Sequence, residues 1–91
     1  MLSAAERKAL KGRAHKLEPV VIIGGKGLTD EVVKEIEAAL KAHELIKVRA
    51  AGLERAQRVP ALEEILSRTG AERVQSVGKV FVIYRKNDAA R

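Results

Sequence analysis

The sequence contains no cysteine and no tryptophan, and it has one phenylalanine and one tyrosine among its 91 residues. The absence of cysteine excludes disulfide bonds, cysteine-ligated zinc and thiol nucleophiles. No apolar run approaches the roughly 18 residues that a membrane-spanning helix needs. The first residues alternate charge with alanine, where a signal peptide would show an apolar stretch. We therefore expect a soluble, cytoplasmic protein with no membrane association, whose small core depends on aliphatic packing.

Residues suited to catalysis or metal binding are also scarce. The two histidines, His15 and His43, are too far apart to offer the spacing of a metal-ligand pair. Ser3 is accounted for as a helix cap, and none of the three serines has an acid–base partner nearby in the sequence. The sequence therefore predicts no enzyme, no metal site and no cofactor.

Positive charge, in contrast, is abundant and uneven. The chain carries 18 Lys and Arg against 12 Asp and Glu, for a net charge of +6, and its first 29 residues contain six cations against two glutamates. A basic block of this kind is typical of proteins that meet phosphate backbones. Because a net charge of this size also serves solubility, charge alone leaves both interpretations open.

The first helix is predicted from its capping box. Ser3 and Glu6 have the spacing in which each side chain binds the other's backbone N–H, and Pro19 sets the latest end of the helix. The helical period places the apolar side chains Leu10, Ala14 and Leu17 on one side. The adjacent side is a cationic stripe formed by Arg7, Lys8, Lys11 and His15.

The remaining elements follow from periodicity, caps and turns. We expect a strand at 20–23 that is covered on both faces, a helix capped by Thr29 and ending near His43, and a strand at 45–51 whose polar side carries Lys47 and Arg49. A third helix is expected from Pro60, or a few residues earlier, to Gly70, followed by a hairpin of strands 72–77 and 80–84. This order predicts a two-layer α/β fold, α-β-α-β-α-β-β, with a mixed four-stranded sheet. Residues 1–86 should form a single domain and residues 87–91 a flexible tail.

A glycine-rich loop, Gly24-Gly25-Lys26-Gly27, lies between the first predicted strand and the second helix. Free N–H groups and the positive end of the helix dipole favour an anion there. The spacing matches neither a Walker A loop nor a dinucleotide-binding fingerprint, for which Asp30 stands in place of the last glycine. A tight turn without a ligand is the other interpretation.

The scarcity of aromatic side chains limits how the protein can bind nucleic acid. RNA-recognition motifs and OB-folds stack several rings on unpaired bases, and this chain has only Phe81 and Tyr84. Contacts from Lys, Arg and backbone N–H groups to phosphate and sugar remain, which favours recognition of the shape of a folded RNA.

A series of shared features then resembles the CRM domain family (chloroplast RNA splicing and ribosome maturation), and closely its free-standing bacterial, YhbY-like form. The resemblance spans about residues 8–86. It is carried by Lys11 and Gly12, Ala14-His15, Pro19, the GxxG loop of Gly24 to Gly27 followed by Leu28-Thr29, His43 to Val48, Gly70, Gly78-Lys79 and Tyr84-Arg85. Pro60 is a departure that affects the start of the third helix.

The resemblance implies a fold similar to the C-terminal domain of translation initiation factor three. It also implies RNA binding through the GxxG loop, and association of bacterial members with precursors of the large ribosomal subunit. We therefore expect an RNA-binding domain that contacts large-subunit ribosomal RNA or its precursor, on a pre-ribosomal particle, and assists assembly of that subunit. The predicted RNA-binding residues are Gly24, Gly25, Lys26, Gly27, Arg7, Lys8, Lys11, His15, Lys47 and Arg49.

Two alternatives remain open from the sequence. One is a protein-interaction adaptor on ribosomal particles that docks through the acidic second helix. The other is a small enzyme that uses the glycine loop to hold a phosphorylated ligand.

Overall fold

The order of helices and strands agrees with the sequence prediction. The structure, a computed structural model, describes residues 2–87. Its elements in chain order are α1 (Ala4–Ala14), β1 (Val21–Ile22), α2 (Asp30–His43), β2 (Leu45–Arg49), α3 (Arg55–Thr69), β3 (Glu72–Val77) and β4 (Val80–Tyr84).

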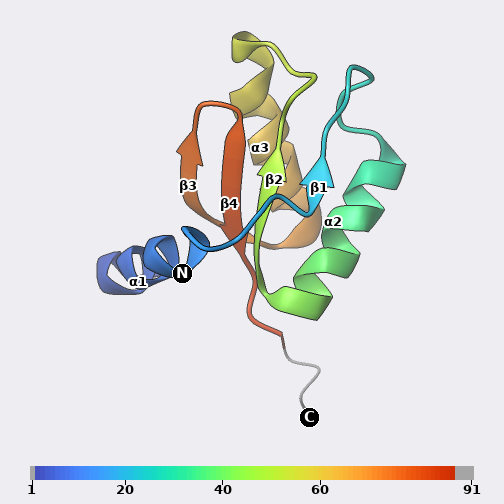
Figure 1. Ribbon diagram of the computed structural model, residues 1–91. Coiled ribbons are helices and arrows are strands. Elements are labelled where there is room, and N and C mark those ends of the chain that lie inside the picture. The colour runs from blue at the N-terminus through green and yellow to red at the C-terminus, as the bar shows by residue number, and fades with distance from the viewer. Residues whose placement is uncertain (1, 88–91) are drawn as a thin grey trace.

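The four strands form one sheet in the order β1-β2-β4-β3 (Figure 1). β1 and β2 are parallel, because α2 carries the chain back along the sheet between them. β4 runs antiparallel to both β2 and β3. The prediction of an α/β fold with a mixed four-stranded sheet is therefore confirmed.

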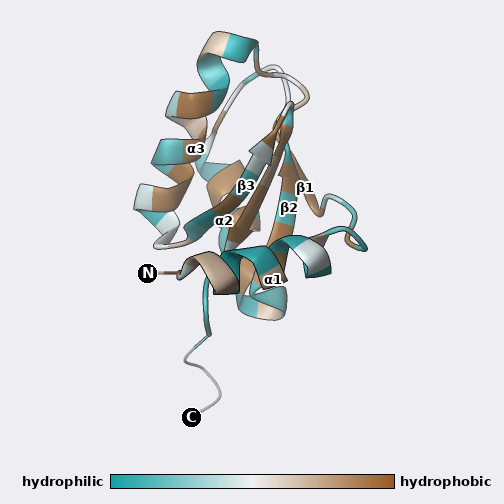
Figure 2. Ribbon diagram, turned by 90° about the vertical axis from the view of Figure 1, so that its left-hand side faces the viewer, coloured by the Kyte–Doolittle hydropathy of each residue, from teal (hydrophilic) through white to brown (hydrophobic). Residues whose placement is uncertain are grey.

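The two faces of the sheet are covered unequally. On one face α2 and α3 bury the main core, whose largest fully buried side chains include Ile36, Ile65 and Phe81. On the other face α1 packs mainly on β2 and β3, where Leu10 and Ala14 meet a smaller apolar cluster. Figure 2 shows α1 and α3 on opposite sides of the strands. The expected two layers thus become three where α1 crosses the sheet.

The helix caps follow the predicted chemistry. Ser3 Oγ accepts a hydrogen bond from the Glu6 N–H at 3.0 Å, and Glu6 Oε1 accepts one from the Ser3 N–H at 2.8 Å. Thr29 Oγ1 accepts from the Val32 N–H at 3.2 Å at the start of α2, and α2 ends at His43 as expected. α1 ends at Ala14, well before Pro19, which the sequence analysis gave as the latest limit of the helix.

Of the two starts that the sequence left open for α3, Pro60 or a few residues earlier, the structure has the earlier one, because the helix begins at Arg55. Its first turn is closed by Gln57, whose side-chain Oε1 accepts a hydrogen bond from the Glu54 N–H at 2.8 Å. Pro60 lies in the second turn and removes one backbone hydrogen bond there. Proline is most favoured at the first helical position, but here the side-chain cap upstream outweighs that preference and sets the earlier start.

The prediction that the first strand is covered on both faces is also wrong. Val21 and Ile23 are buried, whereas Val20 and Ile22 are 51% and 59% exposed. The strand lies at the edge of the sheet, and α1 packs on β2 and β3 instead of reaching over it. A row of aliphatic side chains is therefore left on the surface.

The C-terminal segment is held as far as residue 87, where the flexible tail was expected to begin. The Asn87 N–H donates to Glu44 Oε2 at 2.8 Å, and the Asn87 side-chain amide donates to the carbonyl oxygens of Leu40 and Lys41 at the end of α2. The rest of the predicted tail, residues 88–91, lies outside the described residues.

The unequal cover of the sheet predicts different costs for the same substitution at two isoleucines. Ile36 is fully buried, so Ile36→Ala should lower the free energy of unfolding by about 2–5 kcal/mol. Ile22→Ala on the open face should cost under about 1 kcal/mol. Urea denaturation of both variants measures the difference, and equal losses would mean that Ile22 is covered after all.

Candidate nucleic-acid interface

The glycine loop forms a turn at the carboxyl end of β1. The Gly27 N–H donates to the Gly24 carbonyl at 3.0 Å, and Gly27 has a φ of 78°, a conformation that side chains rarely adopt. Gly24, Gly25 and Lys26 are exposed. The backbone conformation therefore favours glycine at Gly27. Gly24 and Gly25 have no positive φ and have room for a side chain, so the turn does not require glycine there, but the lack of side chains leaves their backbone exposed.

The position of this loop is fixed by a glycine that the sequence analysis did not single out. The Gly52 N–H, in the connection from β2 to α3, donates to the Ile23 carbonyl at 2.8 Å. A Cβ atom at Gly52 would lie 2.0 Å from the Gly24 carbonyl carbon, inside the loop backbone. The two loops emerge at the same end of the sheet (Figure 1), and only a residue without a side chain allows them to pack this closely.

An ion pair offsets part of the negative charge that follows the glycine loop. Asp30 Oδ1 accepts a hydrogen bond from Arg68 Nη2 at 2.8 Å. That hydrogen bond and the positive charge of the guanidinium lower the pKa of the Asp30 carboxyl from its ordinary value, with a smaller contribution from Lys34. The first turn of α2 thus repels an approaching phosphate less than its sequence suggests.

The cationic side of α1 and the polar side of β2 meet in one hollow. Lys11 and His15 of α1 and Lys47 of β2 line it, together with Gln75, Val77 and Val80 of the β3–β4 hairpin. The hollow has a volume of about 270 Å³. The sequence predicted Lys11, His15 and Lys47 separately, but it gave no signal for the hairpin residues beside them.

The other predicted cations surround this hollow at different positions. Arg7 is half-buried, and its Nε donates to the Arg73 carbonyl of β3 at 3.3 Å. Lys8 is exposed. Around the helix axis it lies about 160° from Leu10, which faces the sheet, whereas Lys11 lies about 100° from Leu10. Lys8 therefore lies at the outer margin of the cationic stripe.

Arg49 connects this hollow to the glycine loop. Arg49 and Lys47 are two residues apart on β2, so their side chains share one face about 6.6 Å apart along the strand. The Arg49 carbonyl accepts a hydrogen bond from the Ile23 N–H at 2.8 Å, directly before Gly24. Arg49 therefore lies between Lys47 and the end of β1 at which the glycine loop begins.

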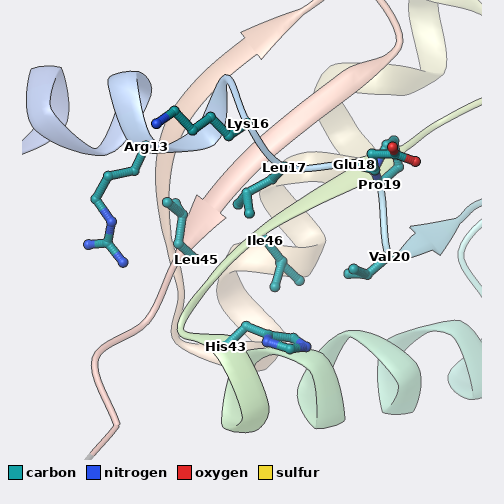
Figure 3. Close-up of a pocket in the computed structure, with 9 residues that line it drawn as sticks. All are labelled: Arg13, Lys16, Leu17, Glu18, Pro19, Val20, His43, Leu45 and Ile46. Carbon is teal, nitrogen blue, oxygen red and sulfur yellow. The ribbon is translucent and has the colours of Figure 1, made fainter.

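A second hollow lies on the other flank of α1, where the chain leads from α1 into β1. Figure 3 shows Leu17, Val20, Leu45 and Ile46 around it, with Arg13 and His43 at its margin. Its volume is about 410 Å³. None of the predicted binding residues lines it, so this hollow is separate from the surface described above.

Within residues 2–87 no group of three or more His, Asp or Glu side chains is placed to hold a metal ion. No helix in the same range is long and apolar enough to cross a membrane.

Comparisons with known proteins agree on one family. Residues 2–85 match the family model described as the CRS1 / YhbY (CRM) domain. A protein of Haemophilus influenzae named "RNA-binding protein" is 46% identical over 90 residues, which cover 99% of this chain and 91% of that protein. A protein of Pseudomonas aeruginosa named "probable RNA-binding protein" is 43% identical, over 94% of this chain and 83% of its own length.

A solved structure shows the same fold. The solution structure of a Staphylococcus aureus protein, proposed to bind RNA, superposes with a TM-score of 0.84 at 31% sequence identity. The superposition covers 97% of this chain and 92% of that one.

The packing of Gly52 on the glycine loop predicts a large effect from one methyl group. Gly52→Ala should lower the free energy of unfolding by about 1–3 kcal/mol, because backbone atoms of Gly24 and Gly25 must move. Gly12→Ala is the matched control, since a Cβ atom there meets nothing within 4 Å and alanine favours the helix. Thermal melting of both variants should show a loss at Gly52 and none at Gly12; an unchanged Gly52 variant would contradict the close packing.

Proposed function

Because this chain belongs to the CRS1 / YhbY (CRM) domain family, we propose that it is a non-enzymatic RNA-binding protein that contacts structured RNA through the glycine loop and the neighbouring cationic surface. This surface comprises Lys11, His15, Lys47, Arg49 and the loop Gly24–Gly27. Its RNA is the ribosomal RNA of the large subunit or its precursor, and its role is to assist assembly of that subunit on a pre-ribosomal particle.

The observation that carries this proposal is the gathering of cations from separate segments. Lys11 and Lys47 are 36 positions apart in the sequence and line the same hollow. Arg49, on the same face of β2, leads from there to the loop, where Lys26 is exposed. A line of cations, of which Lys11, Arg49 and Lys26 are exposed and Lys47 is half-buried, is suited to follow a phosphate backbone toward a turn with exposed glycine backbone.

The adaptor alternative has less support, because two of the four acidic side chains of α2 already have partners inside the protein. Glu37 accepts a hydrogen bond from Arg85 Nη1 at 2.6 Å, and Asp30 is paired with Arg68. These groups are less available to a basic partner than free carboxylates on a helix surface. The enzyme alternative gains nothing from the hollow beside Lys47, which is lined by a glutamine, valines and cations without a carboxylate.

The shared hollow predicts that two lysines from different elements act together. The double variant Lys11→Ala, Lys47→Ala should bind a structured ribosomal RNA fragment more weakly than the parent, on the order of tenfold, because each substitution removes a charged contact with the RNA. For the parent we expect log K to fall with log salt at a slope of roughly −3 to −6, and for the variant a slope shallower by about 1.5. Titrations at several salt concentrations measure both quantities.

The control removes the same charge from the other side of the molecule. Lys34→Ala with Lys41→Ala also deletes two exposed lysines, both on α2, and should leave the affinity within about twofold of the parent. If this control weakens binding as much as the first pair does, net charge alone accounts for the affinity and the proposed surface is wrong.

The glycine loop allows a test of charge that leaves its backbone undisturbed. Gly25 has open space for a side chain and no positive φ, so Gly25→Asp and Gly25→Asn introduce side chains of equal size that differ in charge. We expect the aspartate variant to bind RNA more weakly than the asparagine variant by about 1 kcal/mol or more, and Lys26→Ala to show a loss of about 1 kcal/mol. RNA titration beside thermal melting checks this, and equal affinities of the two Gly25 variants would remove the loop from the interface.

A further inference from the structure

One row of side chains crosses the whole sheet beside the glycine loop and is left open by α1. Strand pairing places Ile22 opposite Arg49, Arg49 opposite Val80, and Val80 opposite Val77. Side chains paired in this way point to the same face of a sheet. This set of four, from β1, β2, β4 and β3 in turn, is called the open row below.

The rows beneath it are progressively covered. The next row contains Lys47 and Val82, and Val82 is buried. The row below contains Leu45, which packs against α1. α1 and the chain that follows it cross the lower part of the sheet, whereas its upper part has no helix over it on this side (Figure 1). The open row is therefore at the end of the sheet face that α1 does not cover, although Val80 packs against the margin of the α1 cluster.

The open row is apolar to an unusual degree for a solvent-facing surface. Ile22 is 59% and Val77 58% exposed, and Val80 is half-buried between Arg49 and Val77. Single exposed aliphatic residues are common and need no explanation. Val77 and Val80 are neighbours in this row, and Ile22 lies beyond Arg49, so together with the arginine they form a surface that can take a flat apolar group next to a cationic hollow.

From this arrangement we infer that the open row receives an unpaired base of the bound RNA, with the phosphates beside that base held by Lys47 and the α1 cations. The inference rests on the proposed function and specifies the class of RNA: a helix that carries unpaired nucleotides, such as a bulge or an internal loop. The aliphatic side chains cover the face of the base, and the planar guanidinium of Arg49 lies among them to stack on it.

The chemistry of a nucleotide matches this surface in both of its parts. A base has a flat, weakly hydrated face that stacks on apolar side chains or on arginine planes, and its phosphate is anionic. The open row supplies the first kind of contact, and Val77 and Val80 of that row also line the hollow. Lys47, one row further down the sheet, and Lys11 and His15 of α1 supply the second kind from the same hollow. Tyr84 lies in the row of Leu45, against the α1 cluster, so aliphatic groups and Arg49 take the place of the aromatic ring that other RNA-binding sheets use.

The test compares two RNAs and two protein variants. The probes are a fully paired RNA duplex and the same duplex with a three-nucleotide bulge. The test variant is Ile22→Ala with Val77→Ala, and the control is Val59→Ala, which truncates a valine that is 64% exposed on α3. We expect the parent and the control to prefer the bulged RNA on the order of tenfold, and the test variant to lose that preference while it binds the duplex as the parent does.

Methyl resonances give an independent measure of the same contact. Bulged RNA should shift the methyl proton resonances of Ile22, Val77 and Val80 upfield through the ring current of a base, and the duplex should leave them in place. Equal binding of both RNAs by the parent, or a bulge preference that survives in the test variant, would overturn the inference and leave the proposed function standing. A parent that binds neither RNA overturns both. A test variant unchanged toward both RNAs likewise overturns the inference.

Discussion

The packing of α1 on only part of one sheet face determines which side chains of that face remain accessible for binding. Two residues of α1, Leu10 and Ala14, pack on the sheet in one small cluster, whose other members are Leu45, Val74 and Val82. This contact does not extend to the ends of the strands nearest the glycine loop (Figure 1). It has two consequences. The cations on the exposed flank of α1 are held next to Lys47, and the end of the sheet nearest the glycine loop remains open to solvent.

The distribution of ion pairs reinforces this asymmetry. On the α2–α3 side, Arg68 and Arg85 are paired with Asp30 and Glu37, so charge there is largely balanced within the protein. On the α1 side, the hollow that brings Lys11, His15 and Lys47 together contains no carboxylate. Positive charge is thus left unbalanced within this hollow, where it can act on an anionic polymer.

Local sequence signals predicted those features that depend on local interactions. The Ser3 and Thr29 caps, the helical period of α2 and the glycine of the β3–β4 turn each act within a few residues, and the structure confirms them. The family model and the relatives named as RNA-binding proteins agree with the family resemblance seen in the sequence.

The features that the sequence did not predict depend on tertiary neighbours. The exposure of Ile22 follows from the length and position of α1 and not from the strand's own residues. The role of Gly52 arises from a loop 28 positions earlier in the chain. The sequence left the start of α3 open between Pro60 and a few residues earlier, and the Gln57 cap that decides it lies upstream of the proline. The open row needs the register of all four strands, which no single segment encodes.

The claim that α1, β2 and the glycine loop form one RNA-binding surface is tested most directly by mapping which backbone amides respond to RNA. We predict that titration of the isotopically labelled protein with a structured large-subunit RNA fragment shifts the amide resonances of residues 11–15, 24–27 and 47–49 together, at the same RNA concentration. Shifts concentrated on the outer faces of α2 and α3, with those three segments unchanged, would contradict the account.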